Sequence, residues 1–484
     1  MRLANILRHG TWPELEISGV TADSRAVRPG ALFVAIPGTR QDGRAFIGPA
    51  VAAGAVAVLA PPGTSWPEGV PARPLIEDAE PRRALALAAA ILAGRQPRQI
   101  VAVTGTNGKT SSVEFLRQIW TLAGHRAASL GTLGLNAPGF PSGEGLTTPD
   151  PVSLANTLAA LAAAGIEHAA MEASSHGLDQ FRLDGVQLAA GAFTNLTRDH
   201  LDYHGTEAAY RTAKLRLFSD LLPAGAPVVA NADMDAETLA QLTAIAANRR
   251  LNLLTVGEAG GAIRLLRATP RPDGQELEIE TGGTRRTILL PLPGRFQADN
   301  ALLAAALGLA LGEAGAIGHL ENLTGVRGRM ELAARLPNNA AVYVDYAHTP
   351  DALERLLLAL RPHTEGRLHL VFGAGGDRDR GKRPLMGAIA ARLADAAIVT
   401  DDNPRTEDPA TIRAAILQAC PNAAEIGDRA AAIAAALSDL GPGDVLAVAG
   451  KGHEQGQTIG TDVLPFDDVA TVRRCIGTQR AGQP

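Results

Sequence analysis

The chain has 484 residues, of which 46% are hydrophobic and 20% charged, and its formal net charge is -5. At roughly 100–200 residues per domain, this length and composition predict two to four domains of a soluble globular protein. Without a basic excess we expect no nucleic-acid partner. Two cysteines cannot build a disulfide framework or a zinc-binding cysteine pattern, which favours a reducing compartment.

Residues 1–95 have the pattern of a small domain. The first residues lack the apolar core of a secretory signal. The stretches ALFVAIPGT (31–39) and AVAVLA (55–60) predict strands, a proline-rich loop follows over 61–74, and a helix is expected over roughly 80–94. We place the first domain boundary near residue 95.

Residues 96–332 alternate strand and helix patterns. The short apolar runs QIVAV, AAMEAS, AGAFTNL and PVVAN predict buried strands, and their alternation with helices predicts a parallel sheet covered on both faces. Residues 262–292 instead alternate like a hairpin insertion. The longest apolar run, 301–312, is too short to cross a bilayer, so we expect no membrane insertion.

Residues 333–484 predict a third sheet. The apolar runs LHLVF, AAIVT and VLAVA each precede a loop rich in glycine, aspartate, asparagine or histidine. Loops after parallel strands line one crevice, where ligands bind. We therefore expect Arg378, the loop DNPR (402–405) and Glu454 to meet there.

The stretch VAVTGTNGKTSS (101–112) predicts a strand, a phosphate-binding turn and a helix. Gly105 and Gly108 let the backbone amides point inward, Lys109 can reach the β- and γ-phosphates, and the Thr110 hydroxyl can bind Mg²⁺. The helix adds its positive end. Val103 replaces the first glycine of the common pattern, and the loop alone does not select a reaction. The alternative is a tight turn with an incidental lysine.

Further polar residues follow in the central segment. Glu172 ends the run AAMEA, where a carboxylate could hold Mg²⁺ opposite the loop or merely serve a structural role. The stretch TNLTRDHLDYH (194–204) gathers two aspartates and two histidines, of which one histidine could ligate a metal. Zinc is the weaker alternative because no soft ligands accompany them. On residue pattern alone, Lys214 would be a surface lysine.

These motifs in this order resemble the Mur ligases, in particular the tripeptide synthetases that add the third residue of the peptidoglycan stem peptide. The resemblance covers nearly the whole chain, through ADSR (22–25), GTNGKT, TTPD, MEASSHGLDQFR, RDHLDYH, GRME (328–331), VDYAHTPDALE, FGAGGDRDRGKR, DNPR and GKGHE. It implies an α/β fold of three domains: a UDP-binding domain (1–95), a central P-loop ATPase-like parallel sheet (96–332), and a C-terminal Rossmann-like, amino-acid-binding domain (333–484).

The resemblance also implies roles for individual residues. Catalytic roles fall on Lys109, Glu172, His200 and Lys214. Nucleotide contacts fall on Gly105, Thr106, Asn107, Gly108, Lys109, Thr110, Ser111, Asn300, Arg329, Asp345 and His348. Contacts to the UDP-muramoyl-dipeptide fall on Ser24, Thr39, Arg40, Gln41, Thr147, Thr148, Ser174, Gln180 and Arg182. Amino-acid contacts fall on Arg378, Asp402, Asn403, Pro404, Arg405, Gly450 and Glu454. The turns at 39–41 and 297–300 depart from the usual family forms.

Magnesium ligands implied by the resemblance are Thr110, Glu172, His200 and Lys214. In this family a lysine in the frame Y-x-x-A-K-x-x-L-F, matched here from Tyr210 to Phe218, is carbamylated and so becomes an anionic oxygen ligand. The cofactors expected are ATP and Mg²⁺.

The implied activity is ATP-dependent joining of meso-diaminopimelate to UDP-N-acetylmuramoyl-L-alanyl-D-glutamate through an acyl phosphate, by a cytoplasmic monomer. Arg405 suits the distal carboxylate of diaminopimelate, whereas a lysine head group there would meet a like charge. The alternatives are the lysine-adding ligase, folylpolyglutamate synthase, a P-loop switch or motor that hydrolyses ATP without either co-substrate, and a UDP-sugar binding protein.

Overall fold

The computed structural model describes residues 1–7, 14–38, 41–141, 143, 145–197, 199–271 and 273–481. The chain divides into two compact units. The first comprises Met1–Arg264 and Asn300–His319, and the second comprises Leu265–Asp299 and Leu320–Pro484. Within the described ranges, no helix is both long and apolar enough to span a bilayer.

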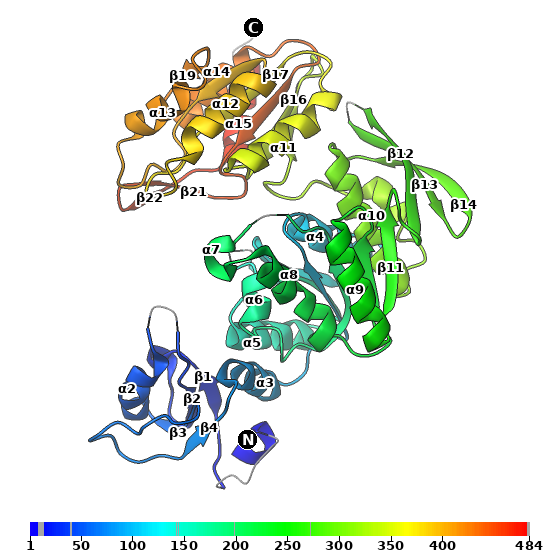
Figure 1. The fold of residues 1–484 in the computed structure, drawn as a ribbon. Helices are drawn as coiled ribbons and strands as arrows, with labels where there is room; N and C mark the ends of the chain where they lie inside the picture. The colour runs from blue at the N-terminus through cyan, green and yellow to red at the C-terminus, as the bar shows by residue number, and fades with distance from the viewer. Residues whose placement is uncertain are drawn as a thin grey trace. The chain divides into compact units, whose positions relative to one another are not determined.

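The first unit begins with a four-stranded parallel sheet in the order β1-β2-β3-β4 (Figure 1). Its strands are β1 (Gly19–Thr21), β2 (Ala31–Val34), β3 (Ala55–Ala60) and β4 (Leu75–Glu77). One face packs on α2 (Ile47–Ala52), and the other packs on α1 (Leu3–Ile6) and α3 (Pro81–Ala93). The strands and helix predicted in this segment are therefore confirmed.

The same unit contains most of a second sheet. The strands of this sheet that belong to the unit run in the order β11-β10-β9-β5-β8-β6-β7. They are β5 (Gln99–Thr104), β6 (Ala127–Gly131), β7 (Gly134–Asn136), β8 (His168–Glu172), β9 (Leu188–Phe193), β10 (Pro227–Asn231) and β11 (Asn252–Gly257). All neighbours among these strands pair in parallel except β6 and β7. The predicted parallel sheet is confirmed.

Helices cover this sheet and bury its strands. They are α4 (Lys109–Leu122), α5 (Pro151–Ala163), α6 (Ser175–Asp179), α7 (Leu201–His204), α8 (Glu207–Arg216) and α9 (Ala236–Arg249). Strand β5 lies between β8 and β9, with the remaining strands of the sheet arranged on either side of it. In open parallel sheets a crevice forms at the carboxyl end of such a strand, because the connections diverge there. The GTNGKT loop follows β5 directly.

The second unit holds a hairpin and a six-stranded sheet. The hairpin pairs β13 (Gly274–Thr281) with β14 (Thr284–Leu290), which confirms the predicted insertion; β12 (Ile263–Arg271) precedes it, and α10 (Arg295–Ala310) follows. The sheet order is β15-β16-β20-β17-β18-β19. Its strands are β15 (Glu331–Arg335), β16 (Ala341–Asp345), β17 (Leu368–Phe372), β18 (Ala396–Val399), β19 (Ala424–Glu425) and β20 (Val445–Ala449).

Two layers of helices cover this sheet (Figure 1). Along β17, Leu370 and Phe372 pack in one apolar cluster and Val371 in the other, as alternation along a strand requires. The first cluster includes α11 (Pro350–Leu360), α12 (Lys382–Leu393) and α13 (Pro409–Leu417), and the second includes α14 (Arg429–Ser438) and α15 (Asp468–Ala481). A short hairpin, β21 (Gly456–Ile459) with β22 (Asp462–Pro465), follows β20.

Candidate active site

The GTNGKT loop is held by its own lysine and by the close approach of Asn300. The Lys109 Nζ donates to the carbonyl oxygens of Gly105 (2.9 Å) and Thr106 (2.8 Å). Gly108 has φ +83°, and a Cβ there would stand 2.3 Å from the Asn300 Oδ1. Glycine is therefore required at this position, by its backbone angle and by the close approach of Asn300.

Residues after β9 hold the same loop from a neighbouring strand. The Thr194 hydroxyl donates to the carbonyl of Asn107 (2.6 Å), and the Asn107 amide donates to Asn195 Oδ1 (3.0 Å). Sequence reasoning did not single out Thr194 or Asn195. The signal available was their position after an apolar strand next to β5, which becomes evident only when the strand order is known.

Glu172, at the end of β8, is 1% exposed. Its Oε1 accepts from the Thr110 hydroxyl (3.0 Å) and from the Thr132 amide (2.8 Å). Space for this carboxylate exists because residue 131 is glycine: a Cβ there would lie 2.0 Å from Oε1. Two oxygen ligands thus lie side by side at the start of α4, and oxygen is the donor that Mg²⁺ prefers. These residues fit a magnesium ion.

A hydrogen-bonded network joins the TTPD turn to the end of β8. The Thr148 hydroxyl donates to the carbonyl of Glu172 (3.0 Å) and lies 3.0 Å from the Ser174 Oγ. The Arg182 guanidinium donates to the Thr148 carbonyl (2.6 Å) and to the Gln180 Oε1 (2.8 Å). The Thr147 hydroxyl lies 3.0 Å from that of Thr132. The structure therefore brings together five of the nine residues expected to contact the UDP-muramoyl-dipeptide.

Lys214, on α8, is 1% exposed. Its Nζ donates to the Gly105 carbonyl (2.6 Å) and lies 4.5 Å from the centre of the Tyr210 ring. Burial, reinforced by the charge of Lys109, lowers the pKa of Lys214 well below its ordinary value. Burial likewise raises the pKa of Tyr210 to about 12. The default reading of Lys214 as a surface lysine is wrong, because the side chain turns into the protein toward the phosphate loop.

His200 is the N-cap residue directly before α7 and has a left-handed conformation, with φ +52°. Its ring is half-exposed, 3.5 Å from Asp199, and meets the ring of His176 edge-on at 4.9 Å between centroids. Burial lowers the pKa of His176 and of His204. His176 is a member of this cluster that sequence reasoning missed, although it lies inside the quoted MEASSHGLDQFR stretch.

Asn403 lies at the centre of a second polar cluster, at the carboxyl ends of β18 and β20. Its side-chain amide donates to Glu454 Oε2 (2.9 Å), and its side-chain oxygen accepts from Lys451 Nζ (3.1 Å). Lys451, which is fully buried, also pairs with Glu454 at 3.0 Å. The Arg405 guanidinium donates to the carbonyls of Gly376 (2.8 Å) and Asn403 (3.4 Å). Arg405 and Glu454 are therefore both bonded to Asn403.

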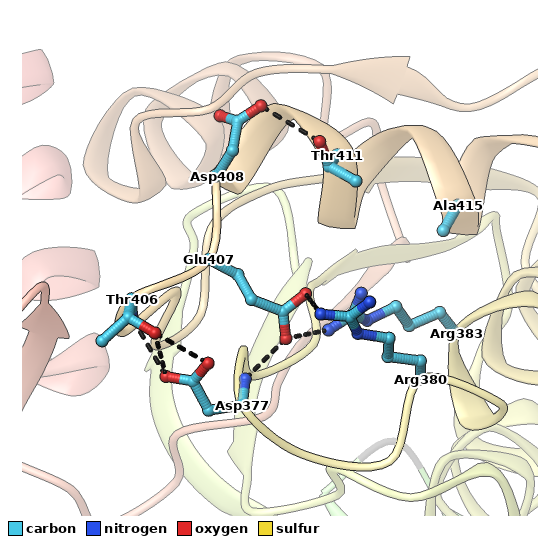
Figure 2. Close-up of a pocket in the computed structure, with 8 residues that line it drawn as sticks. All are labelled: Asp377, Arg380, Arg383, Thr406, Glu407, Asp408, Thr411 and Ala415. Carbon is cyan, nitrogen blue, oxygen red and sulfur yellow. Dashed lines mark hydrogen bonds and ion pairs between the residues drawn. The ribbon is translucent and has the colours of Figure 1, made fainter.

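The loop after Arg405 is fixed by ion pairs, as Figure 2 shows. Glu407 accepts from the Asp377 amide (2.6 Å) and pairs with the buried Arg383 (2.9 Å), and Asp377 accepts from the Thr406 hydroxyl (2.9 Å). Arg383 lowers the pKa of Glu407. Arg405 itself has φ +52°, and this surrounding network supports that strained backbone.

Asp345, at the end of β16, is a third anchoring point of the second unit. Its carboxylate accepts from the amides of Met330 (2.7 Å) and Ala347 (2.8 Å), and burial raises its pKa. The Arg329 guanidinium lies 5.0 Å from the centre of the Tyr346 ring. The His348 carbonyl accepts from Lys382 Nζ (2.8 Å).

The remaining predicted residues have these positions. Ser24 and Gln41 follow the neighbouring strands β1 and β2, and the Gln41 carbonyl accepts from the Gly38 amide (3.0 Å). Thr39 and Arg40 lie outside the described residues.

Ser111 is buried in the first turn of α4. Asp402 and Pro404 are buried, and a Cβ on Gly450 would stand 2.3 Å from the Asp402 carboxylate. Arg378 is exposed, and among the described residues no hydrogen bond links it to Asn403, Arg405 or Glu454.

The fold and the loop after β5 define a P-loop nucleotide-binding protein of several α/β domains. Profiles of known families match most of the chain: "Mur ligase family, catalytic domain" over residues 16–92, "Mur ligase middle domain" over 103–308, and "Mur ligase, glutamate ligase domain" over 328–452. The chain belongs to the Mur ligase family.

Individual relatives agree with this assignment. The UDP-N-acetylmuramoyl-L-alanyl-D-glutamate--2,6-diaminopimelate ligase of Caulobacter vibrioides is 56% identical over 477 residues, 97% of each chain. A solved structure of a ligase of that name is 33% identical, covers 99% of both chains and has a TM-score of 0.74. The structure of a MurF ligase from Thermotoga maritima in complex with ADP shares the fold, with a TM-score of 0.61 at 21% identity and coverage of 95% and 97%.

The predicted α/β fold of three domains is thereby confirmed. The protein is an ATP-using enzyme that forms amide bonds, as members of this family are.

Proposed function

We propose that the enzyme ligates meso-2,6-diaminopimelate to UDP-N-acetylmuramoyl-L-alanyl-D-glutamate, forming the tripeptide precursor of peptidoglycan. The observation that carries this proposal is the cluster around Asn403, which holds the guanidinium of Arg405 and the carboxylate of Glu454. Diaminopimelate ends in an ammonium and a carboxylate on one carbon. A guanidinium and a carboxylate held on a common residue match both charges.

The lysine-adding ligase is the second candidate, and the same cluster argues against it. Lysine has an ammonium but no carboxylate at its far end, so nothing would neutralise Arg405. The buried Lys451 already occupies Glu454 Oε2 with a positive charge. A further ammonium without its carboxylate would add repulsion in a partly desolvated site.

The oxygens of Thr110 and Glu172 would hold Mg²⁺, which neutralises phosphate charge when bound. His200 and Lys214 would hold a second ion after carbamylation of Lys214. A lowered pKa supports this modification, because CO₂ reacts with a neutral amine and Lys214 keeps its amine neutral more readily than an exposed lysine. The carbamate would place an anion beside Gly105 and Lys109.

The reaction has two steps. The γ-carboxylate of the D-glutamyl residue attacks the γ-phosphorus of ATP, and the bond to ADP breaks. The amine of diaminopimelate then attacks the acyl carbon, phosphate leaves with the electron pair, and the amine loses a proton. Lys109 and the backbone amides of its loop place positive charge at the transferred phosphoryl group, and positioning of the reactants accounts for most of the acceleration.

The proposal includes three domains, residues 1–95, 96–332 and 333–484, in a monomeric cytoplasmic enzyme. The first would bind the UDP moiety through Ser24, Gln41 and the two residues before Gln41. Arg378 belongs to the proposed amino-acid site, although no hydrogen bond joins it to Asn403 among the described residues, and its role would depend on the bound amino acid.

Phosphate release from ATP tests the proposal. With the UDP-muramoyl-dipeptide present, meso-diaminopimelate should stimulate release and yield the tripeptide, whereas L-lysine should do so far less. Equal product from lysine would overturn the assignment of the amino acid. ATP turnover that needs neither co-substrate would instead support a P-loop switch.

A further inference from the structure

A cluster of three potential metal ligands lies in the first unit, at the end of the sheet where β8 begins. The phosphate loop lies at the opposite end of these strands. His125 follows the end of α4, His168 is the first residue of β8, and Glu313 follows the end of α10. Glu172 lies at the other end of β8, and Lys109 at the other end of α4. The cluster is therefore separate from the catalytic groups described above.

The three side chains converge. The His125 Nε2 lies 2.7 Å from the Glu313 Oε1, and the imidazoles of His125 and His168 stack at 4.3 Å between centroids. One ligand atom from each residue lies within 4.8 Å of the others. Among the described residues this is the one group of three such side chains close enough to share an ion. Among the described residues no hydrogen bond engages the His168 ring.

We infer that His125, His168 and Glu313 form a binding site for a divalent transition-metal ion of the zinc class. Two imidazoles and one carboxylate are a ligand set that zinc accepts, with water in the remaining position. Imidazole nitrogen favours zinc, nickel or cobalt over magnesium, which prefers oxygen. The ion would bind independently of the Mg²⁺ used in catalysis.

The surroundings suit this chemistry. The carboxylate of Glu313 is largely buried and would balance part of the ion's charge. The His125 ring is partly exposed, which leaves an entry path from solvent.

The fold predicts what binding would do. His125, His168 and Glu313 belong to three segments that pack together: a Cβ at Gly308 of α10 would lie 3.4 Å from Ile119 of α4, and α4 packs on β8. An ion held by all three segments binds the folded state only. Its binding therefore stabilises the folded state by mass action, by an amount that rises with the logarithm of the free metal concentration once that concentration exceeds the Kd.

Trp120 provides a local reporter. Its ring lies 5.2 Å from that of His168, and it is fully buried. Co²⁺ in the cluster should quench its fluorescence. Trp120→Phe should abolish this component of quenching and leave the affinity unchanged, since the indole is not a ligand.

The experiment titrates chelator-treated full-length enzyme with Zn²⁺ by calorimetry, and with Co²⁺ by fluorescence, in excess Mg²⁺ to occupy oxygen sites. We expect one site whose affinity falls at least about tenfold in His168→Ala, His125→Ala and Glu313→Gln. His200→Ala, in the separate histidine cluster, and His319→Asn should retain that site. Thermal unfolding without metal checks that each variant is folded.

Zinc should also raise the unfolding temperature of the wild type and not that of His168→Ala. Unchanged affinity and quenching in folded His125→Ala and His168→Ala would refute the site. A loss of zinc affinity in His200→Ala, with affinity retained in the cluster variants, would also refute it. None of these readouts requires ligase activity, so they stand apart from the proposed function.

Discussion

The Nζ of Lys214 lies 2.6 Å from the carbonyl oxygen of Gly105, the same oxygen that accepts from Lys109 Nζ. Two lysine nitrogens thus share one acceptor inside the protein. Their mutual repulsion adds to the desolvation of Lys214, which is why the pKa of this amine is well below that of an exposed lysine. The lowered pKa makes the neutral, nucleophilic form of this amine more accessible, and this is the physical basis for the proposed carbamylation.

Replacing Lys214 should stop ligation. In Lys214→Ala no anionic ligand can form, and we expect activity to fall by roughly 10²–10³-fold or more, as when a charge-stabilising group is removed. Phosphate release and tripeptide formation measure the effect, and added bicarbonate should not restore them. Lys214→Arg, which keeps a cation, should be equally impaired.

Mass spectrometry provides the companion test. The chain has four lysines, at positions 109, 214, 382 and 451. An adduct of one CO₂ should map to Lys214 and be absent from Lys214→Arg. Full activity in Lys214→Ala would remove this residue from the mechanism.

Gly131→Ala should displace the carboxylate of Glu172. The added methyl group would stand 2.0 Å from its Oε1, so the side chain must move away from Thr110. Because the position of this carboxylate determines the proposed Mg²⁺ site, we expect a marked loss of kcat and a higher Mg²⁺ requirement. Gly318→Ala is the matched control, since a Cβ there meets no atom within 4 Å. If both variants titrated with Mg²⁺ alike, Glu172 would not be a ligand.

Arg405→Ala should impair use of diaminopimelate selectively. Leaving the distal carboxylate of the substrate unpaired in a partly buried site costs about 2–5 kcal/mol. We therefore expect kcat/KM for diaminopimelate to fall strongly while the KM for ATP changes little. Steady-state kinetics with each substrate varied in turn checks this. A uniform loss for all three substrates would indicate general damage to the second unit.

Glu407→Gln should act through the position of Arg405. The amide cannot pair with Arg383, which is 2% exposed, so the loop from Arg405 to Glu407 loosens. We expect a higher KM for diaminopimelate with a smaller change in kcat. Asp351→Asn, which breaks the exposed pair with Arg355 on α11, should leave both constants unchanged. An unaltered KM in Glu407→Gln would show that the loop keeps its conformation without this ion pair.

Acidification should destabilise the protein partly through His453. Burial, more than the neighbouring Arg329, lowers the pKa of this histidine to about 4. The unfolded chain then binds more protons between its ordinary pKa of about 6.5 and pH 4, so stability falls as the pH falls through that window. Across this window the free energy of unfolding should fall by about 3 kcal/mol because of this histidine. In urea titrations His453→Gln should flatten this dependence, and His319→Asn should not.

The sequence by itself determined the chemistry of the GTNGKT loop and the type of most elements. Glycines, lysine and threonine act there within one turn, so spacing along the chain fixes their arrangement. Short apolar runs likewise predicted the buried strands β5 and β10, and a helical pattern predicted α3, because these signals lie within single segments of the chain. The position of Glu172 after an apolar run suggested that it lies opposite this loop, but its hydrogen bond to Thr110, 62 residues earlier, required the strand order.

Only the tertiary structure decided which distant groups meet. Lys214 contacts a carbonyl 109 residues before it, because α8 lies against the phosphate loop, where Tyr210 also meets Thr106. His125, His168 and Glu313 have no shared motif, and they converge because two helices end where strand β8 begins. The order of the strands in the sheet determines which distant residues come into contact. That order depends on the free energy of the whole packed core, so it cannot be predicted from any single segment.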